Sequence, residues 1–161
     1  MKPRAAKTKS EPSPSEQVEG FIRKFDPAIA KLTRAVRKEM RKRFPSAVEL
    51  VYDNYNALAI GFGPNERASD AIFSIAVYAR GVNLYFIYGR SLSDPQKLLQ
   101  GQGSQGAFIR VDDMKVLDEP GVRALIDAAT KHARPRFPEK GRGYTVIKSI
   151  SAKQRPRRPG A

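Results

Sequence analysis

The chain contains no cysteine and only one histidine, His132, among its 161 residues. The lack of cysteine excludes disulfides, thiolate nucleophiles, iron–sulfur ligation and cysteine zinc sites. A single histidine also excludes metal sites that need two histidines, including the H-E-x-x-H pattern. Much of the usual catalytic and metal-binding chemistry is therefore unavailable to this sequence.

The sequence also lacks an apolar run of about 18 residues, the length that a membrane-spanning helix requires. Its first ten residues are basic and polar, without the apolar stretch of a secretory signal. We therefore expect a cytoplasmic protein with no membrane partner. The composition, 40% hydrophobic and 29% charged residues, is typical of one globular domain.

Helix start signals occur near the N-terminus. Ser13 and Glu16 flank a proline in the form of a capping box, which predicts a short helix. A second proline-led signal, followed by apolar residues every three or four positions, predicts a longer helix over residues 26–44. The last expected helix covers residues 118–132.

After this second helix, the pattern changes from helical periodicity to strand-like alternation. Clusters of Gly, Pro and Asn separate four expected strands, over residues 48–52, 57–62, 71–79 and 82–88. Their short links imply antiparallel hairpins. A fifth strand is expected near residues 108–111 and an edge strand over 144–150. The sequence therefore predicts an α+β fold, with an antiparallel sheet of about five to six strands covered by N-terminal helices and one C-terminal helix.

The net charge of +14 is concentrated in particular segments. Residues 1–12 have no apolar periodicity and are expected to form a disordered basic arm. Residues 13–150 are expected to form the domain, followed by a basic tail rich in proline and arginine over 151–161. Within the domain, residues 31–43 carry seven Lys or Arg against one Glu. Such clustering is typical of a protein with an anionic partner.

One stretch resembles a known family. The run Leu92-Ser-Asp-Pro-Gln-Lys-Leu-Leu-Gln-Gly-Gln-Gly103 is similar to the corresponding part of the YdhG-like family of small bacterial proteins of unknown function. The similarity extends over residues 15–150 and includes the strand over 48–52 and the helix over 118–129. This resemblance implies a bacterial protein with a frataxin-like α+β fold.

The remaining motifs favour structural interpretations. Residues 101–106 match G-x-G-x-x-G, but the loop leads into a strand, whereas a dinucleotide loop opens a helix. His132 ends an expected helix, where the helix dipole favours a cation. Asp112 and Asp113 would point to opposite faces of a strand, so they form no catalytic pair. We therefore predict no catalytic residues, no metal site and no cofactor, and we prefer a binding module to an enzyme of unrecognised type.

Clustered cations supply the candidate site. Arg34, Arg37, Lys38 and Arg41 have the spacing to share one exposed side of a helix. The tail cations would extend on a mobile arm that neutralises phosphates without reading bases. The candidate residues for binding an anion or nucleic acid are Arg34, Arg37, Lys38, Arg41, Lys148, Lys153, Arg155, Arg157 and Arg158.

These residues favour a non-enzymatic binding or adaptor module whose basic helix and tail contact an anionic partner. Nucleic acid is the preferred partner, followed by an acidic protein. The alternative is an iron-binding chaperone, because some relatives with the frataxin-like fold are described as iron chaperones. Iron binding without cysteine or several histidines needs clustered carboxylates, whereas the corresponding helix here is cationic and would repel the metal.

Overall fold

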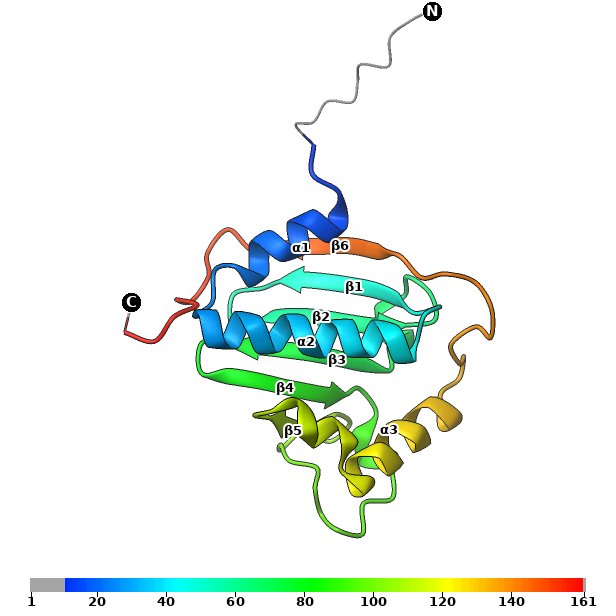
Figure 1. The fold of residues 1–161 in the computed structure, drawn as a ribbon. Coiled ribbons are helices and arrows are strands. Elements are labelled where there is room, and N and C mark those ends of the chain that lie inside the picture. Colours follow the sequence, from blue (N-terminus) through cyan, green and yellow to red (C-terminus); the bar gives the residue numbers. More distant parts are fainter. Residues whose placement is uncertain (1–10, 161) are drawn as a thin grey trace, which may run out of the picture.

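The computed structural model describes residues 11–160, which form an α+β fold with helices packed on one sheet (Figure 1). The helices are α1 (Pro14–Ile22), α2 (Pro27–Arg43) and α3 (Pro120–His132). The strands are β1 (Val48–Asp53), β2 (Leu58–Gly63), β3 (Phe73–Tyr78), β4 (Gly81–Phe86), β5 (Ala107–Val111) and β6 (Thr145–Ile150). Short 3-10 helices span Ala68–Asp70, Gly89–Ser91 and Met114–Asp118.

The α+β class predicted from the sequence is confirmed. The basic arm expected over residues 1–12 lies, apart from its last two residues, outside the described residues. Within residues 11–160, no helix has the length and apolar character needed to cross a bilayer.

The N-terminal helices begin at the signals that the sequence contains. Ser13 Oγ accepts a hydrogen bond from the Glu16 amide at 3.1 Å, and the Glu16 carboxylate accepts one from the Ser13 amide at 2.8 Å. These two bonds complete the predicted capping box. Pro27 occupies the first turn of α2, where its missing amide proton costs no helical hydrogen bond.

The sheet has the strand order β5-β4-β3-β2-β1-β6. Strands β1 to β4 pair antiparallel, as their short links predict. Strand β5 also pairs antiparallel with β4, although a longer connection over residues 87–106 joins them. Strand β6 pairs parallel with β1, so the sheet is mixed where a purely antiparallel one was expected. The chain leaves β5 at one edge and passes through α3 before it reaches the opposite edge. No hairpin therefore fixes the direction of β6.

The core lies between one face of the sheet and the helices, which all lie on the same side of it (Figure 1). In the apolar stripe of α2, Val36 and Met40 are fully buried, and Ile29 and Leu32 are partly buried against the same core. Phe44 follows α2, and its ring stacks on Phe73 with 5.5 Å between centroids, while Phe137 packs against both rings. Because this stripe faces the core, most lysines and arginines of α2 are directed to its other sides, and Arg37 is the buried exception.

Candidate anion-binding groove

A groove runs along the C-terminal half of α2, where it faces the segment that leads into β6. Its volume is about 340 Å³, and it is lined by Lys38, Arg41, Lys42, Phe44, Pro45, Ala47, Glu49, Arg142, Gly143 and Tyr144. A smaller hollow of about 270 Å³ shares Lys38 and Arg41 and continues to Arg34 and to Glu19 of α1. We call the two hollows together the basic groove.

The basic groove contains more cations than its carboxylates neutralise. Four cations line the larger hollow, Lys38, Arg41, Lys42 and Arg142, against one carboxylate, that of Glu49. Within residues 11–160, neither the two lysines nor Arg142 forms an ion pair with a carboxylate, and Arg41 reaches Glu49 only at 4.0 Å. All four are exposed. Exposed cations around a concave surface attract an anion to it.

The single carboxylate of the larger hollow is already held by a buried arginine. Arg37 donates from Nε and Nη2 to the two carboxylate oxygens of Glu49 at 2.8 and 2.9 Å. Thr145 Oγ1 donates to the same carboxylate at 2.6 Å. The side chains of Arg37 and Glu49 are only 6% and 3% exposed. The two-bond ion pair joins α2 to β1 and neutralises Glu49, and the Thr145 hydrogen bond adds β6 to this connection.

A close backbone contact places Arg142 and Tyr144 in the groove. The amide of Gly143 donates to the carbonyl of Pro45 at 2.8 Å. A Cβ atom at position 143 would overlap the carbonyl oxygen of Ala47, so only glycine fits here without a backbone shift. The contact brings the cation before Gly143 and the aromatic ring after it against the connection between α2 and β1.

Tyr144 is 52% exposed and lines the groove. Its hydroxyl donates to Glu66 Oε2 at 2.8 Å. This hydrogen bond, with smaller effects from desolvation and the Glu66 charge, raises the pKa of Tyr144 above its usual value. The phenol is therefore neutral at neutral pH. An exposed aromatic ring beside unpaired cations is an arrangement found in single-strand binding sites.

The cations predicted on α2 divide into two groups. Lys38 and Arg41 line both hollows, and Arg34 lines the smaller one, where it pairs with Glu19 at 2.8 Å. The expectation that Arg37 is exposed is wrong, because it is 5% exposed and bonded to the carboxylate of Glu49. This buried acid on β1 draws Arg37 inward from the cationic run.

Two cations of the groove were not among the predicted residues. Lys42 belongs to the same cationic helix as Arg41, and the charge run alone would have been enough to include it. Arg142 had no comparable signal, because its position beside α2 depends on the parallel pairing of β6 with β1 and on the close backbone contact between Gly143 and Pro45.

The C-terminal segment was expected to extend away from the domain, but it does not. Residues 151–160 lie on the side where α1 ends and α2 begins (Figure 1). Arg157 is 6% exposed, donates to Asp53 Oδ1 at 2.8 Å and lies over the ring of Phe25. Arg158 donates to main-chain carbonyls just after α1. The segment is thus packed on the domain, and the prediction of a mobile arm is wrong for these residues.

The other C-terminal candidates also lie outside the basic groove. Lys148 donates to the carbonyl of Glu66 at 3.1 Å, and the guanidinium of Arg155 lies 5.7 Å from the centroid of the Tyr55 ring. Lys153 is exposed on the same segment. The predicted cations therefore do not form one surface.

Asp53 is the buried anchor of the C-terminal segment. Burial by itself would raise the pKa of its carboxyl group, but hydrogen bonds from Lys24, Gln154 and Arg157 outweigh burial and lower that pKa below its usual value. Lys24 Nζ and Arg157 Nη2 lie 2.7 and 2.8 Å from the carboxylate oxygens. The carboxylate therefore remains ionised at neutral pH and holds both cations.

Across residues 11–160, no three His, Cys, Asp or Glu side chains come together in a way that would hold a metal ion. The iron-binding alternative therefore has no ligand set among these residues.

No family model, curated protein or solved structure matches this chain. The resemblance to the YdhG-like family and the frataxin-like label therefore stay predictions.

Proposed function

We propose that this protein is a non-enzymatic module that binds nucleic acid through phosphate contacts in the basic groove. The observation that supports this proposal is a set of four exposed cations around a hollow whose one carboxylate is already bonded to Arg37. Lysine and arginine bind phosphate oxygens without selecting a base sequence. We therefore expect binding that depends on charge and geometry and little on sequence.

Tyr144 favours nucleic acid over an acidic protein as the partner. Its exposed ring borders the same hollow as Lys42 and Arg142. Stacking of a base on such a ring contributes about 1–3 kcal/mol, whereas carboxylate side chains have no aromatic face to stack. Single-stranded nucleic acid is the form that can present both phosphates and an unpaired base to the groove.

The test is the affinity for short mixed-sequence DNA, single-stranded and duplex, measured by fluorescence anisotropy across a salt series. Four phosphate contacts predict a log–log slope of about −3 to −4 for duplex DNA, and so a loss of about 100-fold between 0.05 and 0.2 M salt. A slope near zero would contradict the phosphate contacts.

Point substitutions assign the contacts to the groove. The triple variant Lys38→Gln, Lys42→Gln and Arg142→Gln is expected to reduce the slope to about −1. The matched control removes three exposed cations outside the groove, in the variant Lys97→Gln, Lys115→Gln and Arg136→Gln. Equal losses in both variants would mean that net charge, and not the groove, attracts DNA.

The partner class is tested by two further measurements. Tyr144→Leu is expected to weaken single-strand binding about tenfold while Tyr144→Phe, which keeps the ring, changes it little. Polyglutamate of comparable charge is expected to bind much more weakly than DNA. If polyglutamate binds as tightly and Tyr144→Leu has no effect, an acidic protein replaces nucleic acid as the partner.

A further inference from the structure

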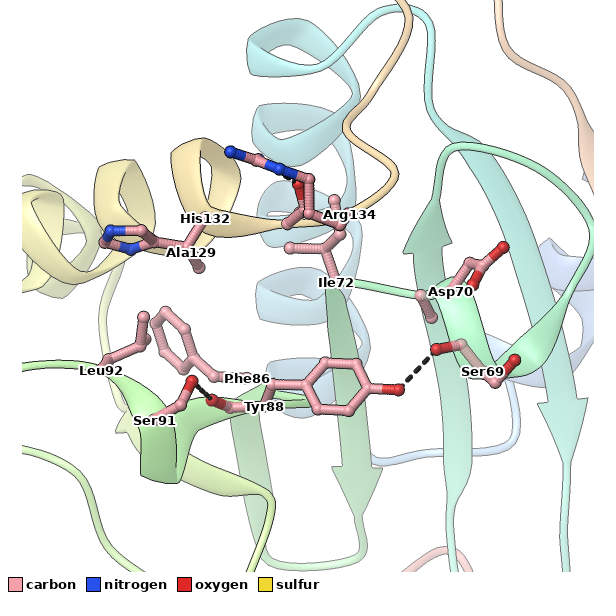
Figure 2. A pocket seen from close by; sticks show the side chains of 12 residues that line it. Ser69, Asp70, Ile72, Phe86, Tyr88, Ser91, Leu92, Ala129, His132 and Arg134 are labelled. Atoms are coloured by element: carbon pink, nitrogen blue, oxygen red, sulfur yellow. Dashed lines mark hydrogen bonds between the residues drawn. The ribbon is translucent and has the colours of Figure 1, made fainter.

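A cavity of about 440 Å³ lies where the C-terminal end of α3 meets the start of β3 and the end of β4 (Figure 2). It shares no lining residue with the basic groove. Its apolar lining is formed by Ala71, Ile72, Phe86, Leu92, Ala129 and Ala133. This volume and this largely apolar lining are typical of sites for small organic molecules.

The wall opposite α3 is fixed by hydrogen bonds between its own segments. The Tyr88 hydroxyl donates to the carbonyl of Ser69 at 2.6 Å, and Ser91 Oγ donates to the carbonyl of Tyr88 at 2.8 Å (Figure 2). These bonds connect the 3-10 helices Ala68–Asp70 and Gly89–Ser91. The cavity therefore has a formed wall without any ligand, as small-molecule sites usually do.

The charges at the cavity favour an anion. Asp70, the one carboxylate in the lining, pairs with Arg67 at 3.4 Å and accepts a hydrogen bond from Asn65 at 3.1 Å. Arg134 and His132 pair with no carboxylate within residues 11–160. The carboxylate of Asp70 therefore has a counterion, whereas the guanidinium of Arg134 has none.

Arg134 is held at the end of α3 by one of its guanidinium nitrogens. Its Nη1 donates to the carbonyls of Lys131 and Ala133 at 3.0 and 2.7 Å. Its Nε and Nη2 have no acceptor among residues 11–160. The guanidinium lies over the last turn of α3, at the rim of the cavity beside Ile72 (Figure 2). Its two free donors can bind a carboxylate at this rim, in the geometry that arginine uses to recognise planar acids.

We infer that this cavity binds a small organic acid, with its carboxylate on Arg134 and its apolar body against Ile72 and Phe86. The volume accommodates roughly 15 non-hydrogen atoms at about 30 Å³ for each water-sized group. An aromatic monocarboxylate fits this size, the apolar lining and the single unpaired arginine. The inference is independent of nucleic-acid binding, because the two sites share no residue.

The test is a titration of the full chain with 1-naphthoate and with its neutral counterpart 1-naphthamide, followed by amide chemical-shift changes. We expect shifts to cluster at residues 69–72, 86–92 and 129–134, with naphthoate bound about tenfold more tightly than the amide. Arg134→Gln is expected to abolish this preference, whereas Arg134→Lys retains part of it. Arg136→Gln removes the same charge outside the lining and is expected to change neither affinity.

Ala129→Phe and Ala133→Phe place a ring inside the cavity, and either variant that melts within a few degrees of the wild type is expected to lose both probes. Absence of shifts at the lining residues with both probes, or equal affinity for acid and amide, overturns the inference. Shifts that occur instead at the basic groove overturn it as well. DNA binding measured on Arg134→Gln is expected to be unchanged, which separates this site from the proposed function.

Discussion

Arg157→Ala tests whether the C-terminal segment belongs to the folded domain. The substitution removes a charged hydrogen bond of 2.8 Å to Asp53, a second bond of 2.7 Å to the Asn54 carbonyl and the contact with the Phe25 ring. Asp53 keeps Lys24 at 2.7 Å, so its charge is not left unpaired. The loss is therefore about 3 kcal/mol, below the upper range for breaking a buried ion pair.

Thermal unfolding followed by circular dichroism measures this loss. For a chain of this size, about 3 kcal/mol corresponds to a fall in Tm of roughly 6–12 °C. Arg157→Lys keeps the charge without the planar guanidinium, and its Tm is expected to lie between those of the wild type and Arg157→Ala. Lys153→Ala, an exposed change of equal charge in the same segment, is expected to stay within about 2 °C of the wild type. If Arg157→Ala has the same Tm as Lys153→Ala, the packed position of residues 151–160 is refuted.

Three further substitutions test the buried carboxylates of Glu49 and Asp53 and the close backbone contact at Gly143. Glu49→Gln leaves Arg37 with only the more distant carboxylate of Glu19, 3.9 Å from its Nη1, and is expected to lower the free energy of unfolding by about 3 kcal/mol, measured by urea denaturation. Gly143→Ala forces a shift at the Ala47 carbonyl and is expected to cost about 1–3 kcal/mol and to weaken DNA binding in the anisotropy assay. The lowered pKa of Asp53 stabilises the fold above its unfolded-state pKa of about 3.9, and this contribution disappears as the pH falls through the folded-state value. The stability difference between wild type and Asp53→Asn is thus expected to narrow below about pH 4, and a constant difference would contradict the pKa shift.

The sequence predicts the helices and hairpins well because their signals are local. The capping box at Ser13 and the apolar spacing of α2 depend on residues within one or two turns of each other. The hairpins from β1 to β4 likewise follow from short links. The direction of β6 depends on a connection through α3 that crosses the whole sheet, and no local pattern encodes that direction.

The candidate site was only partly predictable for the same reason. The cationic run on α2 identified Lys38 and Arg41 as groove residues, because their helical spacing is local. The burial of Arg37 depends on Glu49, a partner on β1 whose position opposite the helix is set by tertiary packing. The position of Arg142 depends in turn on the close backbone contact between Gly143 and Pro45.

Net charge alone therefore does not locate a binding surface in this protein. The C-terminal segment contains several closely spaced arginines, but Arg157 is bonded to the buried carboxylate of Asp53 and Arg158 to main-chain carbonyls. Lys42 belongs to the cationic run of α2 and Arg142 to a less conspicuous stretch, but both are exposed and have no carboxylate partner within residues 11–160. A cation that already has a buried partner must lose that contact before it can bind a ligand, and that loss offsets the new contact. An unpaired exposed cation has no such cost, and for this reason we propose the basic groove as the surface that binds an anionic partner.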